Sequence, residues 1–219
     1  VVVILFLVLL FAFPKNSLLG QQIKNLEIGS LHSWFRSDGS ELRYGVTTPG
    51  GLAWPALYAQ QDCNCGKGFW IGTTDYTDAE QYGGQTFPYK VVAVGPRTYD
   101  VQNEFIPIEF ETVGKFTAPV VMVDGLLASD LTFTDDLDEV DASIPSDRMI
   151  HNVVNTSIGL TMTRKIMAWA QEGHDNYFIY EYIFKNTGNV DADPEIEKPD
   201  QTLTGVYPYY FYRYCIGRN

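Results

Sequence analysis

The chain is poor in histidine, cysteine and basic residues, and each shortage removes a class of site. Its three histidines, His32, His151 and His174, are scattered, and there is no HExxH motif. Structural zinc sites normally draw four ligands from closely spaced pairs, which neither these histidines nor a lone CNC pair provides. A GxSxG elbow and a glycine-rich loop after a predicted strand are also missing. The residues therefore give no support to a zinc site, a serine hydrolase or a phosphate-binding loop.

The three cysteines, Cys63, Cys65 and Cys215, are an odd number, so at least one is unpaired or pairs elsewhere. Cys63 and Cys65 are only two residues apart, a separation that strains a disulfide between them. We expect one bridge from Cys63 or Cys65 to Cys215. The alternative is a partner cysteine beyond residue 219.

Positive charge is scarce, with 15 basic against 27 acidic residues and a net charge of −12. That balance repels nucleic acid phosphates and anionic lipid, and no run of Lys or Arg offers a basic patch. We expect no nucleic-acid partner and, once a leader is removed, no membrane partner. The charge suits a soluble exported protein that binds cations.

The one long apolar run is at the beginning, where residues 1–13 are all apolar. A bilayer span needs about 20 such residues, so the run fits the apolar core of a signal peptide. We predict a signal peptide over residues 1–20 and a β-rich domain over residues 21–219, secreted or displayed at the cell surface. The alternative is an uncleaved membrane anchor. The missing initiator Met, and an end directly after a predicted strand, suggest a fragment of a longer protein, incomplete at the C-terminus.

No long segment has apolar residues at helical spacing, whereas 19 Gly and 11 Pro punctuate short β-type runs. This pattern predicts an all-β fold, an antiparallel β-sandwich of Ig-like or jelly-roll-like type. The stretch 164–172 also contains helix-forming residues, but the preceding alternation favours a strand there. The predicted strands are Glu41–Val46, Phe69–Thr74, Tyr89–Val94, Ile106–Phe110, Val120–Val123, Ser157–Ala170, Tyr177–Lys185 and Val206–Ile216.

The clearest alternation lies in residues 178–184, where every second residue is aromatic: Phe178, Tyr180, Tyr182 and Phe184. In a strand these rings share one face. Burying them would contribute on the order of 15–25 kcal/mol before chain entropy, so we predict a face of the core. Isoleucines on the opposite face predict a central strand, and the turn at 186–189 predicts a hairpin that returns from Val190.

Exposed rings could instead form a platform on which sugars stack. The candidate residues for that alternative are Tyr180, Tyr182, Trp54 and Trp70. Sugar platforms normally present two or three rings on a surface beside polar groups. Ile179 and Ile183 lie on the opposite face of the same predicted strand, so both of its faces look half-buried, which favours the core.

Residues 130–147 contain seven acids and no base. Clustered carboxylates repel one another, and a hard cation such as Ca²⁺ relieves that repulsion. If a metal binds, Asp135, Asp136, Asp138 and Asp141 are the first candidates. The alternative is a solvated acidic loop, and we expect no other cofactor.

Two catalytic arrangements are conceivable and weakly supported. One pairs Cys63 or Cys65 with His174, and the other uses Glu181 as half of a glycosidase carboxylate pair. Only the fold could bring such partners together, so we predict no catalytic residue.

Four stretches share a further likeness: residues 155–189 (NTSIGLTMTRKIMAWAQEGHDNYFIYEYIFKNTGN), FWIGTTDY (69–76), IPSDRMI (144–150) and LTGVYPYYFYRY (203–214). Together they resemble uncharacterised exported proteins of Gram-negative bacteria that end in a C-terminal (type IX) sorting domain. YxYxFKNTGN is also similar to the strand-turn of Ig-like repeat modules of bacterial surface proteins. The resemblance implies export and brings no activity or catalytic residue with it.

The residues identify no biochemical activity. We expect a non-enzymatic, exported β-sandwich module with a structural or interaction role, whose partner is a glycan or an envelope protein. The alternative is a carbohydrate-binding module or a carbohydrate-active enzyme. A third option is an adhesin that binds by strand addition at an open edge.

Overall fold

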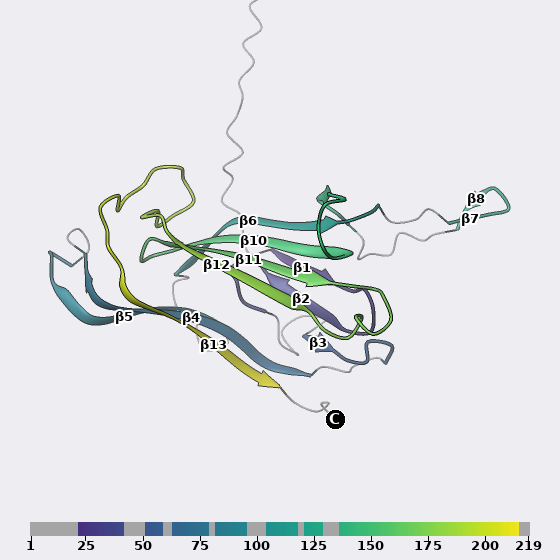
Figure 1. Cartoon of the computed structure of the whole chain (residues 1–219), viewed down its shortest axis with the longest axis horizontal. Coiled ribbons are helices and arrows are strands. Elements are labelled where there is room, and N and C mark those ends of the chain that lie inside the picture. Colours follow the sequence, from purple (N-terminus) through teal and green to yellow (C-terminus); the bar gives the residue numbers. More distant parts are fainter. Residues whose placement is uncertain are drawn as a thin grey trace, which may run out of the picture.

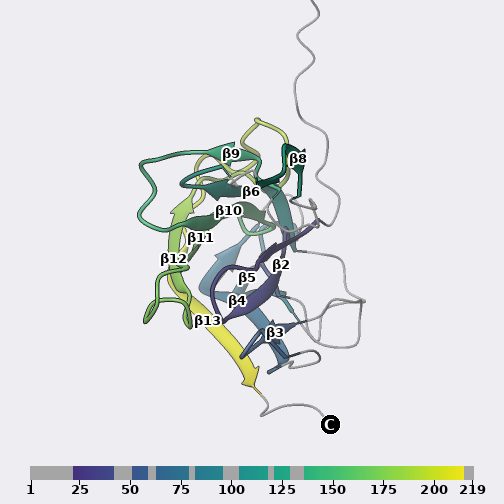
Figure 2. The ribbon, with the colours of Figure 1, turned by 90° about the vertical axis from the view of Figure 1, so that its right-hand side faces the viewer.

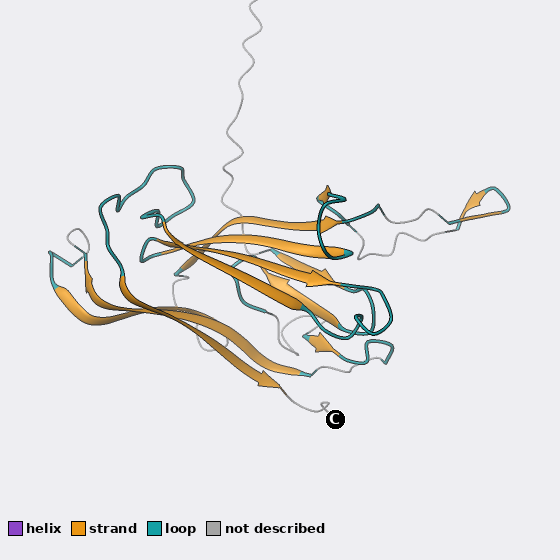
Figure 3. Cartoon of the chain, viewed as in Figure 1, coloured by secondary structure: helices purple, strands orange, loops and turns teal. Residues whose placement is uncertain are grey.

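The structure is a computed structural model that describes residues 22–41, 51–58, 63–78, 82–95, 104–117, 121–128 and 136–214. Every regular element in these ranges is a strand (Figures 1 and 3). Within the same ranges there is no helix long and apolar enough to cross a membrane.

One layer is a five-stranded sheet in the order β12-β11-β10-β6-β9. β10 is antiparallel to both β11 and β6, whereas the short β9 is parallel to β6. The turn between β10 and β11 is closed by Thr156, whose Oγ1 donates to the Leu160 carbonyl at 2.8 Å. The strands are β6 (Phe105–Gly114), β9 (Glu139–Val140), β10 (Arg148–Thr156), β11 (Leu160–Ala168) and β12 (Ile179–Asn186).

Two three-stranded sheets cover the inner face of this layer, as the end-on view shows (Figure 2). One contains β1 (Ile23–Leu26), β2 (His32–Arg36) and β3 (Leu52–Ala53). The other has the order β13-β4-β5, with β4 (Asn64–Thr77), β5 (Thr86–Val94) and β13 (Thr204–Tyr214). A separate hairpin pairs β7 (Met122–Val123) with β8 (Leu126–Leu127). The predicted antiparallel β-sandwich is confirmed.

The alternating rings of β12 face the core, as predicted. Tyr182 and Phe184 pack against the apolar cluster below β4 and β5, and Phe178 and Tyr180 pack against the cluster below β2. The ring of Phe69 on β4 stacks on Tyr182, with centroids 5.6 Å apart. Edge-to-face and offset contacts of this kind stabilise a core beyond its area burial.

The predicted central position of β12 is wrong, because β12 is an edge strand with a neighbour on one side only. Ile179 and Ile183 on its outer face are 46% and 48% exposed. The predicted hairpin from Val190 is also wrong. After β12 the chain runs to Thr204 without a strand and then enters the opposite layer. The amide of Lys198 donates to the Gly188 carbonyl, so the turn closes a loop.

Several strand boundaries differ from those predicted. The predicted strand Ser157–Ala170 begins in the turn between β10 and β11, and β1, β2 and β10 were not predicted. Of the predicted strand Glu41–Val46, only Glu41 is described, and it forms a single bridge with Phe35. β1 and β2 are short and carry polar residues between their apolar ones, which weakens their signal.

A polar layer divides the core into two apolar parts. Arg164 is the middle one of the inward positions of β11, with Leu160 and Met162 in one apolar cluster before it and Ile166 and Ala168 in the other after it. Arg164 has no exposed surface. Its guanidinium donates to the Gly39 carbonyl at 2.7 Å, the Arg36 carbonyl at 3.0 Å and Asn152 Oδ1 at 2.9 Å. These bonds compensate for the desolvation of a charged group.

Candidate functional site

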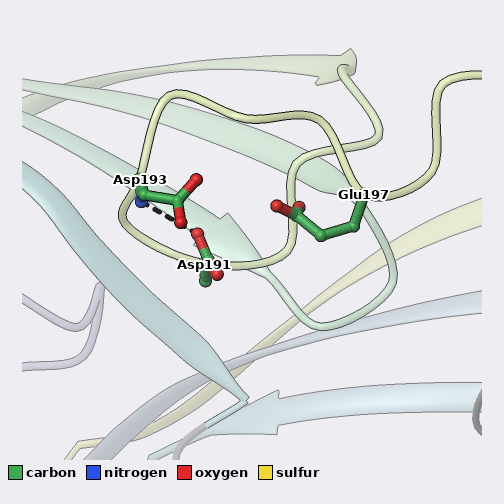
Figure 4. A group of neighbouring side chains, drawn as sticks. All are labelled: Asp191, Asp193 and Glu197. Atoms are coloured by element: carbon green, nitrogen blue, oxygen red, sulfur yellow. Dashed lines mark hydrogen bonds between the residues drawn. The ribbon is translucent and has the colours of Figure 1, made fainter.

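The loop between β12 and β13 brings three carboxylates together. Oxygens of Asp191, Asp193 and Glu197 all lie within 4.8 Å of one another. Figure 4 shows the three side chains extending from one loop toward the space it encloses. No other group of this kind occurs among the residues that the structure describes.

The loop is held by its own polar side chains at every second position. Asn189 Oδ1 accepts from the amide of Asp191 at 3.0 Å, and Asp191 Oδ1 accepts from the amide of Asp193 at 2.8 Å. Asn155 on β10 donates to Asn189 Oδ1 at 2.8 Å, which ties the loop to the five-stranded sheet. Glu197 closes the loop by accepting from the amide of Val190 at 2.9 Å. The carboxylates are therefore already close to one another in the folded chain.

An oxygen-only donor set with several negative charges suits a hard divalent cation. The nearest lysine in sequence, Lys198, pairs instead with Asp78, the residue that follows β4. Burial alone would lower the pKa of Lys198, but its hydrogen bonds to Asp78 and Tyr76 outweigh burial and raise that pKa. The acidic cluster thus consists of Asp191, Asp193 and Glu197, and these residues could bind a metal.

A cleft of about 400 Å³ lies beside the cluster, and Glu197 lines both. Asp75, Asp78 and Asp200 also line the cleft, with Lys198 as its cation. The loop and the cleft thus share Glu197 and form one acidic region.

Of the four acids predicted as metal ligands, Asp138 and Asp141 have other partners. Asp135 lies outside the described residues, and Asp136 is exposed. Asp138 pairs with Lys24 at 2.7 Å and accepts from the amide of Thr112 at 2.6 Å. Hydrogen bonds from Ser143 lower the pKa of Asp141. The number of acids favoured residues 130–147 as the metal site. The observed cluster lies instead in residues 191–197, where every second residue is acidic.

A second candidate surface is the outer face of the sheet β13-β4-β5. Tyr209 pairs with Trp70, which pairs with Ala93, and the next row is Tyr207, Gly72 and Val91. Tyr207 and Tyr209 are 66% and 54% exposed. The rings of Trp70 and Tyr209 lie 5.9 Å apart at 51°.

This outer aromatic face carries no charge over four rows. Its outward positions are Thr204, Tyr207, Tyr209 and Phe211 on β13, Gly68, Trp70, Gly72 and Thr74 on β4, and Tyr89, Val91 and Ala93 on β5. The lysines of this sheet point inward instead: Lys67 pairs with Glu41, and Lys90 pairs with Glu104. On a chain with a net charge of −12, such an uncharged patch makes this face a candidate interaction surface.

The four ring candidates do not form one site. Tyr180 and Tyr182 face the core, Trp70 lies on the outer aromatic face, and Trp54 is exposed beside β3. Phenol burial raises the pKa of both Tyr180 and Tyr182, so their hydroxyls stay protonated.

Among the disulfide candidates, Cys63 has a free thiol whose Sγ lies 3.7 Å from the Trp54 carbonyl. Cys215 and the side chain of Cys65 lie outside the described part, so a bridge between them stays a prediction. His174 contacts the Tyr177 hydroxyl, and Glu181 pairs with Lys165 at 3.3 Å on the outer face of β12.

Comparisons with protein-family models, with curated proteins and with solved structures find no match for this chain.

Proposed function

We propose that the protein is a non-catalytic, exported module that acts by binding at the cell envelope or surface, and that the outer aromatic face is its binding surface. One observation carries this proposal: rings, hydroxyls and small apolar groups cover four successive rows of that face without a charge, and Arg213 follows only in the row beyond Phe211. The apolar residues 1–13 support export, since they match a signal peptide core.

The chemistry of the face favours a neutral polysaccharide as the ligand. Sugars place C–H groups on aromatic rings and hydroxyls against polar side chains. The face offers Trp70 beside Tyr209 for stacking, and Thr74 and Thr204 for hydrogen bonding. An uncharged face on an acidic protein also matches an uncharged chain better than an acidic one.

Replacing Trp70 or Tyr209 by alanine is expected to weaken polysaccharide binding about tenfold or more, because ring truncation removes the stacking contact. Affinity electrophoresis with a panel of neutral and acidic polysaccharides, followed by calorimetry on the best ligand, measures the change. Phe116→Ala is the matched control, since it removes an exposed ring away from this face.

Retention of the neutral polysaccharides by the wild type, reduced in Trp70→Ala and unchanged in Phe116→Ala, supports the proposal. Binding to none of the panel contradicts the sugar ligand. The wild type could instead form dimers in a concentration-dependent way. If Tyr209→Ala abolishes such dimers, a second copy of the chain covers this face.

The acidic cluster is the second candidate site, and the ion that fits it is Ca²⁺. Three carboxylates within 4.8 Å supply the charged oxygen ligands that Ca²⁺ prefers, and main-chain carbonyls or water would complete its coordination. Bound Ca²⁺ would have a structural role, which is to hold the loop between β12 and β13 in one conformation.

Ca²⁺ at a hundredfold excess over its Kd is expected to stabilise the fold by about 2.7 kcal/mol. Thermal unfolding with added Ca²⁺, and again after EDTA, measures the shift in Tm. Asp191→Asn should remove most of it, because it removes one ligand charge. Asp136→Asn is the control at the other acidic segment. Loss of the shift in Asp136→Asn alone would place the ion among residues 136–141 instead.

A further inference from the structure

Lys67 and Glu41 lie in contact inside the sandwich, where an ion pair is least expected. Lys67 occupies an inward position of β4 and is 8% exposed, and Glu41 is 2% exposed. The Nζ of Lys67 forms an ion pair with Oε1 of Glu41. The two residues therefore join β4 to the segment that pairs with β2 through Phe35.

Aromatic side chains enclose this pair. The Nζ lies 4.1 Å from the ring centroid of Tyr180 and 4.9 Å from that of Tyr212. It also donates to the Tyr180 hydroxyl at 2.7 Å, and burial together with the nearby Glu41 raises the pKa of that phenol. The amine of Lys67 thus contacts both the Glu41 carboxylate and the Tyr180 hydroxyl.

A cavity of about 10 Å³ adjoins the pair and is lined by both residues together with Tyr182, Tyr210 and Tyr212. That volume corresponds to about one water molecule. A single small molecule such as the water that leaves the carboxyl group therefore has room beside the pair.

Two buried charges are costly even when paired. Burial lowers the pKa of Lys67, with Glu41 opposing that effect. Transfer of one proton from Nζ to the carboxylate removes both charges. The product is a neutral amine in contact with a carboxylic acid, which are the two partners of amide formation.

We propose that Lys67 and Glu41 condense in the folded protein to form an intramolecular isopeptide bond. The Nζ lone pair attacks Cδ of Glu41, a C–N bond forms, and a C–O bond breaks. The nitrogen gives its proton to the Tyr180 oxygen while the Tyr180 hydroxyl proton passes to the departing oxygen, which leaves as water. The amine and the acid become an amide and one water, with no oxidant or reductant.

The fold favours the amide in two ways. Groups held in contact react as if at an effective concentration of about 10⁵–10⁸ M. The amide also replaces an ion pair in a dry interior by a neutral group. A covalent link between the β1-β2-β3 side and β4 would then remain intact when the sheets separate.

A second lysine–carboxylate pair, in which the lysine is half-buried, provides the comparison. Lys198 contacts Asp78 and bonds to the Tyr76 hydroxyl at 3.0 Å, so its partners are of the same kind. It borders the open cleft, however, and its pKa is raised. Lys198 therefore stays protonated beside solvent, and we expect no condensation there.

The test is the intact mass of the reduced, denatured protein. We expect a mass lower than the sequence mass by one water, and a branched peptide joining the fragments that contain Glu41 and Lys67 after proteolysis. Lys67→Arg keeps a positive charge but has no primary amine that can attack the carboxyl group, so this variant should have the full sequence mass. Lys198→Arg should keep the loss of water.

A wild-type protein that is folded by near-UV circular dichroism and has the full sequence mass overturns the proposal. So does a loss of water that persists in Lys67→Arg, because a dehydrated Asp-Gly pair such as Asp124–Gly125 would then explain it. The branched peptide comes from the wild type alone, so the test holds even if a variant fails to fold.

Discussion

Replacing Arg164 by alanine is expected to cost the folded state about 3–5 kcal/mol. The guanidinium satisfies two carbonyl groups and Asn152 Oδ1 in the middle of the core. Alanine removes the Arg164 donor from the Gly39 carbonyl and from Asn152 Oδ1, whereas the Arg36 carbonyl keeps the Gly39 amide. It also opens a cavity between the two apolar clusters. Domains of this kind are stable by only about 5–15 kcal/mol, so the loss is a large share of the total.

Urea unfolding followed by circular dichroism measures the effect. Lys165→Ala is the matched control, because Lys165 is the next residue on β11 and pairs with Glu181 on the outer face. Exposed pairs contribute about 0–1 kcal/mol, so this variant should unfold close to the wild-type midpoint. Equal midpoints for the two variants would mean that the buried guanidinium is not needed for stability.

Replacing Gly188 by alanine should open the loop that carries the acidic cluster. Gly188 has φ +76°, and an added Cβ would overlap the carbonyl oxygen of Lys198 and lie 3.0 Å from Ile196 Cγ2. A left-handed conformation costs an L-residue about 1–2 kcal/mol. The backbone overlap adds to this cost, since the bond from the Lys198 amide to the Gly188 carbonyl must break to relieve it.

Gly173→Ala separates the two contributions. Gly173 has φ +84°, but an added Cβ there meets no atom within 4 Å, so this variant reports the conformational cost alone. We expect Gly188→Ala to lose at least twice as much stability in urea unfolding, and to lose Ca²⁺ binding that Gly173→Ala keeps. Similar losses in both variants would contradict the close approach of Lys198 to the loop turn.

The sandwich was predictable because alternation is a local property. Four rings at every second position of 178–184 require one buried face in any sheet, and β12 has that face. The same rule places Arg164 in the core, since it shares the parity of Met162 and Ile166. A buried arginine was thus within reach of the pattern, although its acceptors on the segment 36–39 were not.

The position of β12 was not predictable, because an edge and a central strand differ in their neighbours and not in their own residues. Ile179 and Ile183 suggested burial on both faces, but single exposed isoleucines are common on folded surfaces. β12 does end at Asn186, where the turn was predicted to begin. Its return strand was misplaced because Asn189 and Asp191 hydrogen-bond the local backbone, which competes with strand pairing.

The acidic cluster shows the same limit for sites. Charge density favoured 130–147, whereas convergence of ligand atoms depends on a loop held to β10 by Asn155. The outer aromatic face needed the register of three strands that are distant in the chain, so only Trp70 was identified in advance.

The polar layer through the interior has a consequence for how this domain tolerates change. Met162 and Ile166 lie on one strand but in separate apolar compartments, with Arg164 between them. Tyr180 and Tyr182 of β12 stack across this division, but Met162 and Ile166 themselves pack in different clusters, so repacking around one has little direct effect on the other. Changes in the free energy of unfolding caused by substitutions in the two compartments should then be nearly additive. Each half of the interior can therefore change in sequence with little effect on the other half.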